Sequence, residues 1–171
     1  MKLRKLYILP ILLLTVATVF AQEKKVEFKK AQDDNWLVDI DEAYRISKKT
    51  DKPILANFTG SDWCGWCKKL RAEVFNKPEF KKWAEENVIL LELDFPRRTQ
   101  LPAQQMDQNR GLQQAFQVRG FPTIWVFSLD KPEEAKNYAI TAYGKTGYLS
   151  GGASNFTKEV DKMISRKTAS K

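Results

Sequence analysis

The sequence predicts an α/β sandwich. Apolar stretches with the composition of buried strands alternate along the chain with amphipathic helical stretches, which is typical of helices packed on a sheet. The last two strand-like stretches, 123–128 and 138–143, follow one another without a helix between them, so we expect an antiparallel hairpin there. The chain has 171 residues, 43% of them hydrophobic, which is enough for one domain with a substantial core.

The N-terminus has the pattern of a secretory signal. Three basic residues precede an apolar run over 6–20, and Ala21 ends a sequence suited to cleavage. We therefore expect residues 1–21 to be a cleaved signal peptide, residues 22–35 to be a flexible polar tail, and the mature protein to be periplasmic or secreted, without stable membrane insertion. The alternative is an uncleaved membrane anchor, although the run is shorter than the ~20 residues of a spanning helix.

The folded domain is expected over residues 36–166, and its first half alternates helix and strand. In order, we expect a helix from 39 to about 49, a strand over 54–58, a helix from 64 that pauses at 76–78 and resumes over 79–86, and a strand over 88–95. Asp39 or Asp41 is suited to starting the first helix. The run 54–58 is apolar apart from Asn57, as in a central strand covered on both faces.

The second half begins with a stretch, 96–109, that contains arginines, prolines and several glutamines. We expect an exposed loop that leads into a helix; the alternative is a loop that contacts partner proteins, since exposed loops often carry recognition. The later elements expected are a helix over 105–117 with Met106, Leu112 and Phe116 facing inward, strands over 123–128 and 138–143, a helix over 155–165, and a polar end over 167–171.

The two cysteines of the chain, Cys64 and Cys67, lie between the strand 54–58 and the helix that follows it. Residues at this spacing are neighbours on one helical turn. Unpaired amides at a helix N-terminus favour negative charge, so we expect a lowered pKa for the Cys64 thiol. Cys67, one turn further in, is expected to be more buried and less reactive. The pattern predicts a reversible dithiol/disulfide pair with Cys64 as the attacking sulfur.

Composition argues against several other kinds of site. The chain has no histidine, which excludes Cys-His and Ser-His catalysis, and two cysteines alone make a poor metal site, so we expect no metal. A structural disulfide across three residues would close a very small loop and stabilise little, which favours a redox role. The net charge of +8 comes without a dense basic cluster, so we expect no nucleic-acid partner.

Two motifs carry a resemblance to a known family. Residues 63–68 (WCGWCK) resemble the active site of the thioredoxin superfamily, and residues 118–123 (VRGFPT) resemble the cis-proline loop of that fold. The similarity is greatest to exported thioredoxin-like proteins and to the thioredoxin-like domain of periplasmic disulfide reductases, over roughly residues 38–164. The resemblance implies a three-layer α/β/α sandwich with a mixed central sheet.

The resemblance also implies a function, which is thiol–disulfide oxidoreduction by the Cys64–Cys67 pair without an organic cofactor. The implied partners are cysteine-containing exported proteins and a thiol–disulfide electron donor or acceptor. Reduction of substrate disulfides is the favoured direction, with oxidase or isomerase activity as alternatives. A second hypothesis is a thioredoxin-like binding scaffold without turnover.

The substrate-docking residues implied by the resemblance are Trp63, Gly65, Trp66, Phe121 and Pro122. Trp63 has a plainer alternative as a lid on the core. Pro122 is expected to be cis because of the family loop; the alternative is an ordinary trans proline at the start of a strand.

One position departs from the family pattern. Thioredoxins bury an aspartate in the strand before the active site, behind the second cysteine, where it helps to move that cysteine's proton. Asn57 is the position that matches it here, and an amide cannot accept a proton as a carboxylate does. We therefore hypothesise that resolution by Cys67 uses water or another group. The alternative is that Asn57 is only a satisfied polar group of the core.

Overall fold

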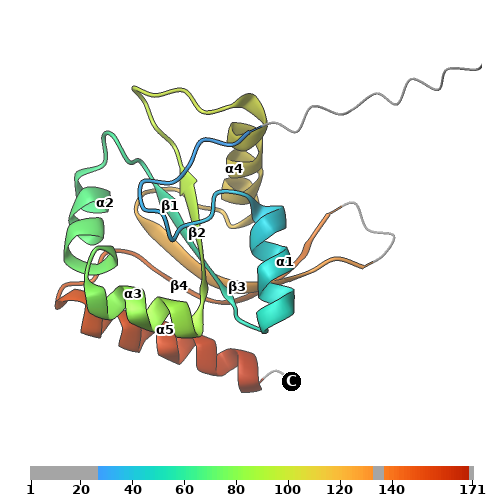
Figure 1. Ribbon diagram of the computed structural model, residues 1–171, viewed down its shortest axis with the longest axis vertical. Helices are drawn as coiled ribbons and strands as arrows, with labels where there is room; N and C mark the ends of the chain where they lie inside the picture. Colours follow the sequence, from blue (N-terminus) through green and yellow to red (C-terminus); the bar gives the residue numbers. More distant parts are fainter. Residues whose placement is uncertain (1–26, 133–136, 170–171) are drawn as a thin grey trace, which may run out of the picture.

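The computed structural model describes residues 27–132 and 137–169 (Figure 1). The predicted signal peptide, 1–21, lies outside these residues. The elements are, in chain order, α1 (Ile40–Thr50), β1 (Ile54–Thr59), α2 (Gly65–Leu70), a π-helical stretch η1 (Arg71–Phe75), α3 (Pro78–Asn87), β2 (Ile89–Asp94), α4 (Ala103–Ala115), β3 (Thr123–Asp130), β4 (Ala139–Thr146) and α5 (Gly152–Ala169). Each predicted helix and strand has its counterpart among them, and the predicted fold class is confirmed.

The four strands form one mixed sheet in the order β2-β1-β3-β4. β1 and β2 are parallel, β1 and β3 are antiparallel, and β3 and β4 form the predicted antiparallel hairpin. Leu37 adds a single parallel bridge to Leu91 of β2. β1 therefore lies inside the sheet, which explains why all of its residues are buried.

Two apolar cores lie on opposite faces of the sheet. Leu55 and Leu90 belong to a core shared with α2, η1, α3 and α5, whereas Ala56 and Leu91 belong to a core shared with α1 and the end of α4. Successive strand residues point to opposite faces, so odd positions of β1 and even positions of β2 face α2. Helices on both sides of the sheet make the molecule a three-layer α/β/α sandwich (Figure 1).

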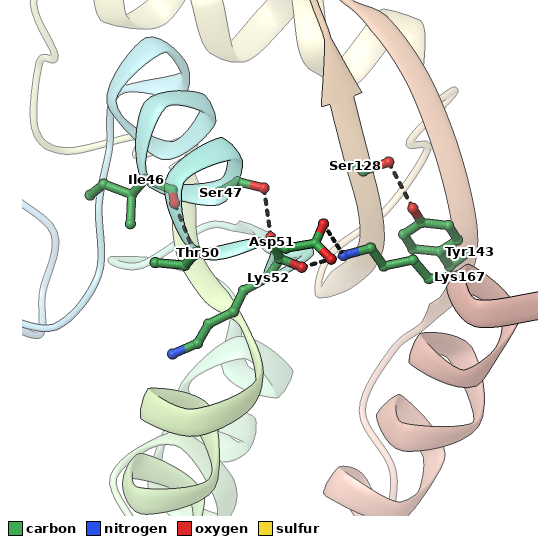
Figure 2. A network of polar contacts seen from close by, with 8 residues as sticks. All are labelled: Ile46, Ser47, Thr50, Asp51, Lys52, Ser128, Tyr143 and Lys167. Carbon is green, nitrogen blue, oxygen red and sulfur yellow. Dashed lines mark hydrogen bonds and ion pairs between the residues drawn. The ribbon is translucent and has the colours of Figure 1, made fainter. Parts of the chain in front are cut away.

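Polar contacts connect the end of α1 to the C-terminal helix. The Asp39 carboxylate caps the start of α1 by accepting a backbone N–H at 2.8 Å. At the other end, Asp51 has a left-handed φ of 54° and forms an ion pair with Lys167 of α5 at 2.8 Å (Figure 2). Ser47 donates to the Lys52 carbonyl at 2.6 Å. The predicted polar end at 167 is thus part of α5, which is longer than the sequence pattern indicates.

The sequence predicts a flexible tail over 22–35, but its described part, from 27 on, contacts the domain. The Lys29 backbone exchanges two hydrogen bonds with the Gln105 amide, at 2.8 and 3.0 Å. Asp33 accepts two hydrogen bonds from the Arg71 guanidinium, both at 2.8 Å. These polar residues find partners on distant elements, which local composition does not reveal.

The inward face of α4 agrees with the prediction in part. Gln105 and Asn109 are buried, Phe116 is buried as predicted, and Met106 and Leu112 are partly exposed. Leu112 still packs against the core, as predicted. The hydrophobic pattern misses Gln105 and Asn109 because their buried amides hydrogen-bond to backbone. Gln105 bonds to Lys29, as described above, and Asn109 donates to the Asp94 carbonyl at 2.9 Å.

Candidate active site

The two cysteines lie where the chain leaves β1 and enters α2. Cys64 is the N-cap residue of α2, and its sulfur is bonded to that of Cys67, with the two Cα atoms 5.3 Å apart. The Cys67 backbone N–H donates to the Cys64 sulfur at 3.2 Å. A donor in the first turn of the helix stabilises negative charge on the Cys64 sulfur when the disulfide is reduced.

Burial does not distinguish the two cysteines in the disulfide-bonded form. Cys64 is 6% exposed and Cys67 is 5% exposed. The predicted difference in exposure is therefore absent here, since the bond holds both sulfur atoms against the first turn of α2. The two cysteines differ instead in their polar neighbours. The Cys67 backbone N–H faces the Cys64 sulfur, whereas Cys67 shares a small cavity with the buried side chains of Asn57 and Glu92.

Three contacts fix the side chain of Trp63, the residue that precedes Cys64. Its indole N–H donates to the Phe95 carbonyl at 2.8 Å, its ring meets Phe121 edge-on with centroids 5.9 Å apart, and the Arg97 guanidinium lies 3.8 Å from the ring centroid. Asp62 holds the Arg97 segment by accepting its backbone N–H at 3.0 Å, and this bond lowers the pKa of Asp62. The stretch after β2 therefore folds back onto the cysteine motif.

Gly60 is the point where the backbone approaches Trp63. A Cβ atom added at Gly60 would lie 2.5 Å from the Trp63 ring, which its other contacts hold in place. We expect Gly60→Ala to lower the free energy of unfolding by roughly 1–3 kcal/mol, as other overpacking changes do, and to alter tryptophan fluorescence. Urea unfolding checks this. In the control, Gly111→Ala in α4, the added Cβ meets no atom within 4 Å; equal stability of the two variants would contradict the prediction.

Trp66 is the exposed aromatic side chain of the motif, at 58%. Its ring lies 5.1 Å from that of Tyr148, and Lys69 approaches both rings. The Tyr148 hydroxyl donates to Glu73 at 2.6 Å, which raises the pKa of Tyr148. Gly65, between the cysteines, leaves open space where a side chain would stand.

The second motif, residues 118–123, contacts Trp63 through Phe121. The Phe121–Pro122 peptide bond is cis, and the Phe121 ring stacks on Phe95 with centroids 5.0 Å apart. Pro122 lines an open groove beside β3 and β4. Trp63 and Phe121, two of the predicted docking residues, are thus in contact, whereas the aromatic neighbour of Trp66 is Tyr148.

Comparison with known proteins identifies the family. The family model described as a thioredoxin-like domain matches residues 40–139, which include both motifs. The chain belongs to the thioredoxin-like family of thiol–disulfide oxidoreductases. A disulfide bond reductase, DsbH of Chlamydia pneumoniae, is 32% identical over 123 residues, which cover 72% of this chain and 69% of that protein.

Other thioredoxin-like relatives extend the match. The thioredoxin-related protein DsbJ of Chlamydia pneumoniae is 29% identical over 96% of this chain, although the match spans only 46% of DsbJ. A solved structure of a DsbH oxidoreductase superposes with a TM-score of 0.65 at 26% identity and covers 80% of this chain and 92% of its own. The thioredoxin-like architecture therefore extends through most of the described residues.

Two buried polar residues of β1 and β2, Asn57 and Glu92, line a small cavity together with Cys67. Asn57 is 6% exposed, and its side-chain oxygen has no hydrogen-bond partner among the described residues. It therefore does not match the alternative of a satisfied core amide. Glu92 pairs with Asn57 in the register of the parallel strands and is 7% exposed. Sequence reasoning passed over Glu92, although a carboxylate inside the run ILLELD is a detectable signal.

Proposed function

We propose that this protein is exported and reduces disulfide bonds in exported proteins. The observation that carries the proposal is the Cys64–Cys67 disulfide at the start of α2, with the Cys67 amide directed at the Cys64 sulfur at 3.2 Å. The likeness to a relative named as a disulfide bond reductase supports the reducing direction. The reaction needs only the cysteine pair, without cofactor or metal.

In the proposed reaction, the Cys64 thiolate attacks a substrate disulfide. A bond forms between the Cys64 sulfur and one substrate sulfur, and the other substrate sulfur leaves as a thiolate and takes up a proton. The Cys67 thiolate then attacks the Cys64 sulfur, which restores the Cys64–Cys67 disulfide and releases the second substrate thiol. The substrate gains two electrons, and a thiol electron donor must reduce the protein again.

Turnover separates the enzyme from a binding scaffold. We expect the protein to catalyse reduction of insulin by dithiothreitol, whereas a scaffold would give the uncatalysed rate. The equilibrium potential of the cysteine pair tests the direction: a value near that of thioredoxin, about −270 mV, supports a reductase, and one near about −120 mV indicates an oxidase. An isomerase would instead restore activity to a protein with scrambled disulfides.

Export rests on the N-terminal pattern, which lies outside the described residues. Within 27–132 and 137–169, no helix is long and apolar enough to cross a membrane. We expect expression of the full chain in a Gram-negative host to release a product that lacks residues 1–21 into the periplasm, and the mass of the periplasmic product measures the cleavage site.

The loop after β2 supplies part of the proposed docking surface. Arg97 covers one face of Trp63, and the backbone amides of Arg97 and Arg98 are both bound by Asp62. The loop therefore places the Arg97 guanidinium on Trp63, the residue that precedes Cys64. This favours the alternative that the stretch contacts partner proteins, in particular acidic segments next to a cysteine.

We expect Arg97→Ala to raise KM for an acidic peptide disulfide several-fold, with a smaller effect on an uncharged peptide. Loss of the Arg97 charge removes an exposed ion pair with the acidic substrate, which is worth up to about 1 kcal/mol and therefore a few-fold in KM. Loss of its packing on Trp63 changes the docking surface for both substrates. Arg97→Lys should recover the charge effect but not the stacking. Arg110→Ala, an exposed arginine of α4, is the control; equal KM values for Arg97→Ala and this control would contradict the role.

A further inference from the structure

We propose that Glu92 of β2 is the group that accepts the Cys67 proton when the mixed disulfide is resolved. The inference rests on the proposed function, and it assigns to this strand the task that an aspartate of the preceding strand performs in thioredoxins. Asn57, at that aspartate's position, can hydrogen-bond to the Cys67 thiol but cannot take its proton.

Strand register brings Glu92 to the correct place. Asn57 and Glu92 are partners in the parallel pairing of β1 and β2, and both lie on the face that α2 covers. Paired strands are about 4.8 Å apart. The Glu92 carboxylate therefore lies one strand away from the position of the thioredoxin aspartate, on the same face of the sheet.

A small cavity connects the three groups. Cys67, Asn57 and Glu92 line the same internal space of about 10 Å³, together with Thr59, Ser61 and Arg71. A space of that size is near the lower limit for one water molecule, which needs polar partners on its walls. The Cys67 thiol and the Glu92 carboxylate therefore exchange a proton across this cavity, either directly or through one water.

Glu92 also lines a wider space on its other side. It lines a second pocket of about 240 Å³, whose walls include Lys29, Ser61, Asp94 and Leu101. Glu92 thus lies between the buried sulfur and a wider polar space toward the surface. A proton taken from Cys67 has a route away from the site, so the carboxylate can serve again in the next turnover.

The surroundings of Glu92 place its pKa where a base for a thiol is effective. Burial, first, and then the neighbouring charges of Asp94 and Asp33 raise its pKa, while the Gln32 amide, which donates at 3.2 Å, and the Arg71 guanidinium lower it, for a result of about 7. Lys68 also lines the inner cavity. Near neutral pH such a carboxylate is partly ionised and able both to accept and to release a proton.

The Cys67 S–H proton passes to the Glu92 carboxylate, and the resulting thiolate attacks the Cys64 sulfur of the mixed disulfide. The bond between Cys64 and the substrate sulfur breaks, and that sulfur leaves with the electron pair and takes a proton from water. Glu92 then releases its proton toward the outer pocket.

Glu92→Gln tests the proposal because it keeps the side-chain shape and removes the base. Single-turnover mixing of the reduced protein with a peptide disulfide, followed by acid quench, measures formation and release of the mixed disulfide from pH 5.5 to 8.5. We expect wild-type release to rise through an inflection near pH 7, and the variant to release at least tenfold more slowly at pH 8 without that inflection. General bases contribute about 10²–10⁴-fold to such steps. Formation of the mixed disulfide should be unchanged, and Glu86→Gln, an exposed carboxylate of α3, should behave as wild type.

A double variant distinguishes a base from a structural role. Asn57→Asp combined with Glu92→Gln returns a carboxylate to the same cavity from the neighbouring strand, so release should recover at least partly together with its pH inflection. Unchanged release in Glu92→Gln, or no recovery in the double variant, would overturn the inference. Failure of the wild type to form any mixed disulfide would overturn the proposed function and this inference with it.

Discussion

Replacement of Cys64 with serine is expected to abolish disulfide reduction, whereas replacement of Cys67 with alanine is expected to leave Cys64 trapped in a mixed disulfide with substrate. Cys64 has the Cys67 amide directed at its sulfur from the first turn of α2, so its thiolate is the stabilised one. Without Cys67, no second thiol is present to release the substrate.

Non-reducing mass spectrometry after mixing with a peptide disulfide measures the trapped species. Cys67→Ala should accumulate the adduct at close to one per chain, and Cys64→Ser should form little. In the reduced wild type, iodoacetamide should modify Cys64 first. Both side chains are similarly buried in the disulfide, so a difference in labelling rate reports on thiolate reactivity. Faster labelling of Cys67 than of Cys64 would reverse the assigned roles.

Local pattern was sufficient for most of the fold. The run 54–58 is β1, the helix expected from Asp39 is α1 with Asp39 as its cap, and the expected hairpin is β3 and β4. In each case, the signal is contained within a few neighbouring residues. Pattern was insufficient where polar side chains bond to distant backbone, as Gln105 does with Lys29, because no neighbouring residue predicts such a partner.

The candidate site also contains some residues that local pattern predicts and others that it does not. The cysteine motif is read directly from the sequence, and its position at the end of β1 follows from local pattern. Arg97 on Trp63 and Glu92 beside Asn57 depend on which strands pair and in what register. A single sequence does not give that register. The absence of the family's aspartate at position 57 and the carboxylate in the run ILLELD are both visible in the sequence, but the pairing of Glu92 with Asn57 is not.

The same carboxylate gives the protein a pH-dependent stability. The pKa of Glu92 is about 7 in the folded protein, against an ordinary value of 4.5. Between these values the folded state holds a proton that the unfolded state has lost, so raising the pH from about 4.5 to 7 favours unfolding, and the loss is complete above 7. A difference of this size corresponds to about 3 kcal/mol.

Glu92→Gln is therefore expected to remove that loss. The free energy of unfolding of the variant, relative to wild type, should be up to about 3 kcal/mol higher at pH 8 than at pH 4.5. Urea unfolding of the oxidised proteins at pH 4.5, 6, 7 and 8 measures it, with Glu86→Gln as the exposed control. The wild type and Glu86→Gln should lose stability together over this range, because both keep the buried carboxylate. If Glu92→Gln follows the same pH dependence as the other two, Glu92 is ionised across the whole range in the folded protein, and its carboxylate is not the group that titrates beside Cys67.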